Sequence, residues 1–161
     1  MGMALLDRVG SVDDCNPTNQ GRAMPNTLDA KASRRSLILR TIYALCLMGA
    51  TYNHWYAIYH HGLNWDYGGF PKGSSTFWTA LAFFDPAAVI LLFLRPNVGV
   101  GLTVGIIVTD VIHNVWIQAR YFPPLLQSLA DSPMVIEQIA FMVFVLVSSP
   151  FAWTMERKTA A

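Results

Sequence analysis

Four long apolar stretches, separated by short polar segments, follow a polar beginning along this chain of 161 residues. They cover residues 37–59, 76–94, 98–119 and 134–153. Each comes close to the roughly 20 residues that a helix needs to cross about 30 Å of hydrocarbon at 1.5 Å per residue. A soluble bundle would need polar helix faces, which these stretches lack. The pattern therefore predicts an all-α fold, a bundle of four transmembrane helices.

The beginning of the chain has a different character. Asn, Asp, Pro, Gly and Thr occur there without periodicity, which is typical of a disordered segment. We therefore expect a mobile polar N-terminal tail over residues 1–33. The membrane domain is expected to cover residues 34–158.

Lysine and arginine are distributed unequally between the two sides of the predicted bundle. Only Lys72 and Arg120 fall on one side, and the other side has Lys31, Arg34, Arg35, Arg40, Arg95, Arg157 and Lys158. Because positively charged segments stay on the cytoplasmic side of a membrane, we expect both termini to be cytoplasmic. No targeting segment is recognisable, so we expect the plasma membrane or a bacterial inner membrane.

Composition agrees with a membrane protein and narrows the range of partners. Hydrophobic residues make up 53% of the chain and charged residues 13%, where about 25% is typical of soluble proteins. The net charge is +1, so no basic field indicates a nucleic-acid partner. The lipid bilayer is the expected partner, and a homo-oligomer or a larger membrane complex stays open.

The connections predict local structure. Arg95, Pro96 and Asn97 form a very short turn, which makes the second and third helices antiparallel neighbours. The loop over residues 121–133 contains PPLLQSL, which favours a short amphipathic turn on the membrane surface. Within the third span, Gly101 and Gly105 are spaced by four residues, as in closely packed membrane helices.

Ionisable residues inside the predicted spans are the most unusual feature of the sequence. Each costs roughly 2.5–3.5 kcal/mol on insertion scales and needs a partner or water. At about 1.5 Å per residue, Asp85 and Asp110 lie roughly 14 Å and 15 Å below the outer boundary. His113 and Asn114 lie about one turn higher, on the face of the helix that carries Asp110. All lie in the outer half of the bilayer.

Three of these residues are candidates for catalysis. Asp85 is too short to reach water and precedes Pro86, which frees the carbonyl of Ala82 from its helical hydrogen bond. Asp110 lies one turn from His113, and a carboxylate at that distance can set the tautomer of an imidazole. We therefore predict Asp85, Asp110 and His113 as catalytic residues.

Further side chains at similar or shallower depth are expected to contact a ligand. The polar ones have a structural alternative, since groups near an interface often serve only as anchors, and Glu137 can reach water along its own chain. Aromatic walls suit a lipophilic ligand with one polar or cationic end. The predicted ligand-binding residues are Asn53, His54, Asn114, Glu137, Trp78 and Trp116.

These residues predict a polar pocket, open toward the outer leaflet, for an amphipathic lipid-like small molecule. Two carboxyl groups at equal depth would share a proton, leaving one acid and one base for an isomerisation. The layout, with an acid on the second span and Val111-Ile112-His113-Asn114 on the third, resembles the EXPERA group of sterol isomerases and sigma-2-type receptors. That resemblance implies the same acid–base chemistry on a lipophilic substrate.

Two other functions stay open at this point, and no cofactor is identified. His54 and His113 are the minimum for haem ligation by two histidines, and the carboxylates could join them at a metal site. However, only one Asp-x-x-His pair is present and the Glu-x-x-His pairs of di-iron bundles are absent. A non-catalytic accessory subunit is the remaining alternative. Transport by a single chain is not favoured, because no polar path continues through the inner half.

Overall fold

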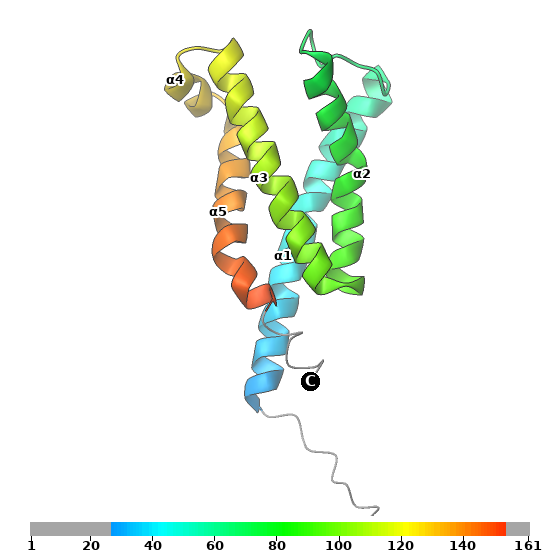
Figure 1. Cartoon of the computed structure of the whole chain (residues 1–161), viewed down its shortest axis with the longest axis vertical. Helices are drawn as coiled ribbons and strands as arrows, with labels where there is room; N and C mark the ends of the chain where they lie inside the picture. Colours follow the sequence, from blue (N-terminus) through cyan, green and yellow to red (C-terminus); the bar gives the residue numbers. More distant parts are fainter. Residues whose placement is uncertain (1–26, 154–161) are drawn as a thin grey trace, which may run out of the picture.

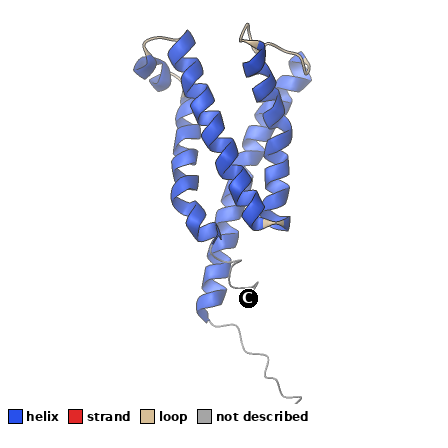
Figure 2. Cartoon of the chain, in the orientation of Figure 1, coloured by secondary structure: helices blue, strands red, loops and turns tan. Residues whose placement is uncertain are grey.

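The computed structural model describes residues 27–153, and this part of the chain is helical without strands (Figures 1 and 2). The prediction of an all-α fold is therefore confirmed for the described residues. Four long helices are joined by short connections, one of which contains a fifth, short helix. The helices are α1 (Thr27–His61), α2 (Lys72–Leu94), α3 (Pro96–Tyr121), α4 (Leu125–Ala130) and α5 (Pro133–Trp153).

Helix α1 begins earlier than the sequence pattern predicted. Residues 27–33, expected in the mobile tail, form its first turns. The physical reason is local composition, because this segment contains Leu, Ala and Lys, which have high helix propensity. The rest of the expected tail lies outside the described residues, as do Arg157 and Lys158.

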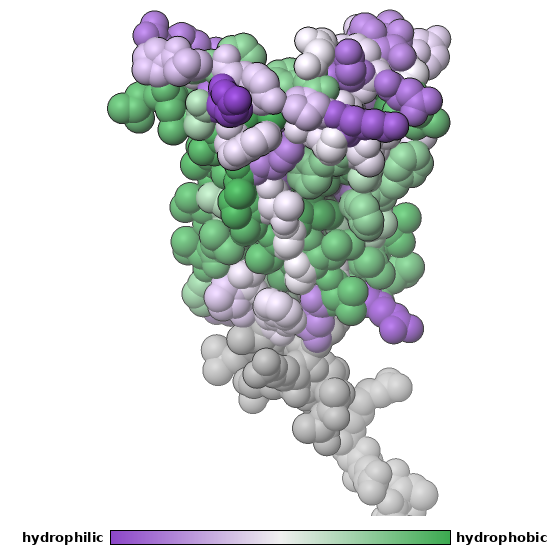
Figure 3. All heavy atoms as spheres, turned by 45° about the horizontal axis from the view of Figure 1, so that its top comes forward, coloured by the Kyte–Doolittle hydropathy of each residue, from purple (hydrophilic) through white to green (hydrophobic). Residues whose placement is uncertain are grey.

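Three helices, α2, α3 and α5, are long and apolar enough to cross a membrane. Helix α1 is not among the three, although it is the longest helix described. It carries Arg40, Asn53 and His54 within the stretch that was predicted to span, and these residues lower its hydropathy. On the face shown in Figure 3, hydrophobic side chains cover the middle of the molecule and hydrophilic side chains gather toward its ends.

The long helices pack in a closed order in which α1 contacts α2, α2 contacts α3, α3 contacts α5, and α5 contacts α1. In Figure 1 the pair α1 and α2 spreads away from α3 and α5 toward the end of the bundle that carries α4. We call this the α4 end. The core includes the fully buried side chains Tyr43, Leu92, Val100 and Val145.

The predicted short turn between the second and third helices is confirmed. Only Arg95 separates α2 from α3. Gly99 is required here because a Cβ at this position would lie 2.3 Å from the backbone nitrogen of Leu92. Gly105, by contrast, has no atom within 4 Å of a Cβ position. The predicted close packing at Gly105 is therefore not made by another helix in the described part of this chain.

Each proline inside a helix frees a carbonyl that a side chain then satisfies. Pro86 cannot donate to the carbonyl of Ala82, and the indole nitrogen Nε1 of Trp55 donates to that oxygen at 3.0 Å. Pro150 likewise leaves the carbonyl of Leu146 free, and the hydroxyl of Ser149 donates to it at 3.3 Å. Both helices thus continue through their prolines, and each freed carbonyl oxygen keeps a hydrogen bond.

Candidate functional site

A cavity of about 450 Å³ lies between α1 and α5, with α2 and α3 contributing the remaining walls. We call it the deep cavity. Its lining combines apolar side chains with one histidine and three carboxyl groups. The residues that line it are Cys46, Leu47, Gly49, Ala50, Tyr52, Asn53, His54, Leu81, Asp85, Ile106, Ile107, Asp110, Met134, Glu137, Gln138 and Phe141.

Asp85 is held in the wall of the deep cavity by the helical repeat of α2. It shares the buried face of this helix with Leu81, Ala88 and Leu92, and it is only 1% exposed. Its Oδ2 lies 3.9 Å from Nε2 of His54 on α1. Its Oδ1 is buried and has no hydrogen-bond partner within the described part of the chain. One oxygen of this buried carboxyl group thus has no hydrogen bond from the described residues.

Asp110 is also buried, at 7% exposure, and differs from Asp85 in having a firm hydrogen-bond partner. The amide nitrogen Nδ2 of Asn114 donates to Oδ1 of Asp110 at 2.9 Å. The same nitrogen donates to Oε1 of Gln138 at 2.9 Å, while Oδ1 of Asn114 accepts from Nε1 of Trp78 at 3.0 Å. Asn114 therefore connects α2, α3 and α5 beside the carboxyl group.

A second cavity, of about 410 Å³, lies nearer to the α4 end. We call it the loop-side cavity, because Tyr67 and Phe70 from the α1–α2 loop form part of its wall. Their rings lie against Trp78, with centroid distances of 5.0 Å and 5.3 Å. It shares five wall residues with the deep cavity: Asn53, His54, Asp110, Met134 and Gln138. The two cavities are thus adjacent parts of one feature, which we call the cleft.

Most of the residues predicted from the sequence as site residues line the cleft. Asp85 and Glu137 belong to the deep cavity, Trp78 and Asn114 to the loop-side cavity, and Asn53, His54 and Asp110 to both.

His113 and Trp116 lie outside the lining of the cleft. The imidazole of His113 lies against Phe77 and Trp78 of α2, at centroid distances of 4.6 Å and 5.4 Å. Trp116 is half-exposed and its ring lies 6.0 Å from that of His113. Asp110, which we expected to set the tautomer of His113, instead accepts a hydrogen bond from Asn114.

The arrangement bears on the metal and haem alternatives. No group of three or more His, Cys, Asp or Glu side chains that could hold a metal ion occurs among residues 27–153. His54 and His113, the pair considered for haem, do not line a common cavity. The described side chains thus offer neither a cluster of three metal ligands nor a shared cavity for the two histidines.

Sequence reasoning missed several polar residues of the cleft, among them Gln138 and Tyr67. Gln138 lines both cavities, and its signal was the helical spacing of Met134, Glu137, Gln138 and Phe141, which marks one face of α5. Tyr67 lines the loop-side cavity and was not among the predicted site residues. It lies in an irregular loop, where periodicity gives no information on direction.

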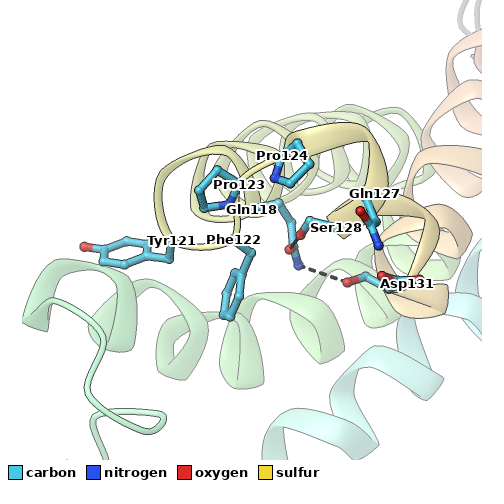
Figure 4. Close-up of a pocket in the computed structure, with 9 residues that line it drawn as sticks. Gln118, Tyr121, Phe122, Pro123, Pro124, Gln127, Ser128 and Asp131 are labelled. Atoms are coloured by element: carbon cyan, nitrogen blue, oxygen red, sulfur yellow. Dashed lines mark hydrogen bonds between the residues drawn. The ribbon is translucent and has the colours of Figure 1, made fainter.

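The predicted turn between the third and fourth spans is a short helix, α4, anchored to α3 by Gln118. Nε2 of Gln118 donates to Oγ of Ser132 at 3.2 Å, and Ser128 donates to Oε1 of Gln118. Figure 4 shows Gln118 turned toward α4, in a surface pocket of about 560 Å³ that includes Pro123 and Pro124. This pocket is a surface feature without an ionisable cluster, since Asp131 is the only charged residue in its lining.

Comparisons with protein-family models, with curated protein sequences and with solved structures gave no significant match. The resemblance in layout to the EXPERA group is thus not accompanied by a family match. The functional argument therefore depends on the cleft itself.

Proposed function

We propose that the chain is an integral membrane protein in which all four long helices span the bilayer, with both termini in the cytoplasm. For α1, the fourth span, the support is its surface. Leu45, Met48 and Ile38 are 68%, 49% and 50% exposed on this helix, as is usual for side chains that face lipid and unfavourable for side chains that face water. The unequal distribution of lysine and arginine between the two ends of the bundle favours cytoplasmic termini.

We propose further that the cleft binds an amphipathic, lipid-like small molecule from the outer leaflet of a plasma membrane or bacterial inner membrane. The observation that carries this proposal is the pair of buried carboxyl groups, Asp85 and Asp110, in the wall of an otherwise largely apolar cavity. Buried carboxyl groups are costly in hydrocarbon and are rarely retained without a function. A cavity of about 450 Å³ also has the size of a small-molecule site.

The same pair is suited to moving a proton on the ligand. Two carboxyl groups in one apolar cavity favour a state in which one is protonated and the other ionised. The ionised group would accept a proton from one ligand carbon while the protonated group gives its proton to another. This exchange shifts a double bond, changes neither composition nor charge and needs no cofactor. His54 lies 3.9 Å from Asp85 and would exchange a proton with it.

Binding can be tested with a monoacylglycerol that carries a photoreactive diazirine in its acyl chain. The protein is reconstituted in phosphatidylcholine nanodiscs, irradiated, and mapped by mass spectrometry. Saturable labelling is expected on the stretches Cys46–His54 and Met134–Phe141, which line the deep cavity. Excess unlabelled monoacylglycerol should compete for it.

A matched pair of glycine substitutions makes this test specific. Gly49 lines the deep cavity and Gly105 does not, and a Cβ at either position has no atom within 4 Å. Gly49→Trp should fill the cavity and abolish saturable labelling, whereas Gly105→Trp should leave it unchanged. Equal labelling of both variants, or labelling spread evenly over lipid-facing residues such as Leu45, would overturn the binding proposal.

Proton transfer is tested separately by isotope exchange. Membrane lipids extracted from the source cells are incubated with the reconstituted protein in D₂O, and lipids that gain deuterium at carbon are identified. Asp85→Asn and Asp110→Asn should lower this exchange by about a hundredfold or more. Asp131→Asn, which changes an exposed carboxyl group outside the cleft, should not. Exchange that is equal in all four proteins would exclude the acid–base role and leave binding intact.

A further inference from the structure

The loop between α1 and α2 places one polar group in the cleft that no helix could supply. Tyr67 lines the loop-side cavity. Its hydroxyl oxygen is buried and makes no hydrogen bond within residues 27–153. A buried hydroxyl normally has a partner, because leaving it unpaired loses the hydrogen bonds that water would make. Among the described residues the Tyr67 hydroxyl therefore lacks a partner, which a molecule in the cavity it lines would supply.

The backbone of the loop is bent in a way that positions this side chain. Tyr67 has φ of 55°, a left-handed conformation that is uncommon for a residue with a side chain. The next two residues, Gly68 and Gly69, also have positive φ, at 88° and 99°. The backbone N–H of Gly68 donates to Oδ1 of Asp66 at 3.1 Å, which closes the turn around Tyr67. Such a conformation persists only where the surroundings hold it, and it is frequent at ligand sites.

Aromatic stacking fixes the direction of the ring. The ring of Tyr67 is stacked on Trp65 at 4.5 Å, and Trp78 of α2 lies 5.0 Å away on the cavity wall. Trp78 is itself fixed by its hydrogen bond to Asn114. The phenol is thus held between a loop residue and a helix residue, so that its hydroxyl keeps a defined position without a hydrogen bond of its own.

The surroundings of the Tyr67 hydroxyl indicate the chemistry of its ligand. No lysine or arginine lines either cavity, so an anionic group would find no cationic partner there. The charged or ionisable residues of the loop-side cavity are His54 and Asp110, in the wall shared with the deep cavity. The remaining polar groups are neutral: Asn53, Tyr67, Asn114, Gln118, Ser132 and Gln138.

We propose that Tyr67 is a ligand-contacting residue whose hydroxyl hydrogen-bonds an uncharged end of the ligand, one that carries a hydroxyl or carbonyl group. This inference rests on the proposed function, since it assigns an orientation to the molecule in the cleft. The uncharged polar end lies in the loop-side cavity against Tyr67. The apolar body extends past the shared wall into the deep cavity, beside Asp85 and Asp110.

The test measures the dissociation constant of monomyristoylglycerol for the full chain in nanodiscs, by competition with the diazirine probe. Tyr67→Phe removes the hydroxyl and keeps the stacked ring. It should weaken binding about five- to tenfold, as expected for one lost hydrogen bond. Tyr59→Phe is the matched control, because Tyr59 is 85% exposed on α1, and its affinity should equal that of the wild type. If Tyr67→Phe binds as tightly as Tyr59→Phe, the proposed role of Tyr67 is overturned.

Tyr67→Asn guards against a folding artefact, because Asn tolerates positive φ. It removes the ring as well and should weaken binding at least as much as Tyr67→Phe, while the unfolding temperature of both variants stays close to that of the wild type. An unfolding temperature that falls in step with affinity would assign Tyr67 a structural role and overturn the proposal.

The chemical class is tested with ligands that share one chain length. Wild-type protein should bind monomyristoylglycerol more tightly than either myristate or tetradecylamine. Equal or tighter binding of a charged analogue would overturn the assignment of an uncharged end. If wild-type protein binds none of these molecules and shows no saturable labelling by the diazirine probe, the proposed function fails and this inference fails with it. If the wild type binds monomyristoylglycerol and Tyr67→Phe binds it equally well, this inference fails and the proposed function stands.

Discussion

The indole nitrogen of Trp55 donates a 3.0 Å hydrogen bond to the carbonyl oxygen of Ala82. Ala82 is fully buried, and Pro86, four residues later, has no N–H to offer that carbonyl. A side chain of α1 therefore completes the backbone of α2 one turn before Asp85. This contact fixes the two helices that carry His54 and Asp85 against each other.

Replacing Trp55 should consequently destabilise the fold through α2. Trp55→Phe leaves the Ala82 carbonyl buried without a donor, which costs about 1–3 kcal/mol of unfolding free energy. In a Pro86→Ala background the restored backbone N–H can bond that carbonyl, so the same substitution should cost clearly less. The measurement is reversible unfolding in mixed micelles. Trp116→Phe, at a half-exposed site, is the control, and equal costs in both backgrounds would contradict the relationship.

The neighbourhood of Asp110 offers a second prediction, because three hydrogen bonds meet at Asn114. Asn114→Leu removes all of them. Polar contacts between membrane helices contribute about 0.6 kcal/mol each on average, so a loss of about 2 kcal/mol is expected. Asn64→Leu, in the exposed α1–α2 loop, should change the unfolding free energy little. A stability of Asn114→Leu equal to that of wild type would show that these contacts are not maintained in the membrane.

How far the sequence predicted this site is best judged from α3. Depth and helical phase predicted that Asp110 is buried, and it is. The same phase placed Asn114 and His113 together, but residues at i+3 and i+4 lie about 60° and 40° to opposite sides of residue i. Because α3 is packed between α2 and α5, Asn114 bonds Gln138 of α5 while His113 lies against Phe77 of α2. The neighbours of Asn114 and His113 are thus determined by which helices pack on either side of α3. A hydropathy pattern does not contain this packing order.

The end of the α1–α2 loop shows a second limit. The connection that contains Gly68 and Gly69 forms no helix or strand. The direction of Tyr67 depends on its own left-handed φ and on stacking with Trp65 and Trp78. These are contacts between residues without a fixed sequence spacing. Sequence reasoning therefore identified the helices and the buried carboxyl groups. It could not identify the loop residue Tyr67 as part of the cavity wall near Asp110.

The tight turn between α2 and α3 leads to a prediction about glycine. A Cβ at Gly99 would overlap the backbone of Leu91 and Leu92 at 2.3–2.5 Å, and backbone atoms cannot move aside as a flexible side chain can. Gly99→Ala should therefore lower the unfolding free energy by about 1–3 kcal/mol or more. Gly105→Ala meets no atom within 4 Å and should be neutral or up to about 1 kcal/mol stabilising, since Ala favours helix. Equal effects of the two substitutions would show that α3 does not approach α2 as described.

The proposed orientation can be tested by labelling single cysteines in intact cells with a membrane-impermeant maleimide. The background is Cys15→Ser with Cys46→Ser. Asn64→Cys and Arg95→Cys place exposed thiols in the α1–α2 loop and the α2–α3 turn, at opposite ends of the bundle. With cytoplasmic termini and four spans, Asn64→Cys should react in intact cells and Arg95→Cys only after permeabilisation. The reverse pattern would invert the topology, and reaction of both in intact cells would contradict a bundle that spans the bilayer.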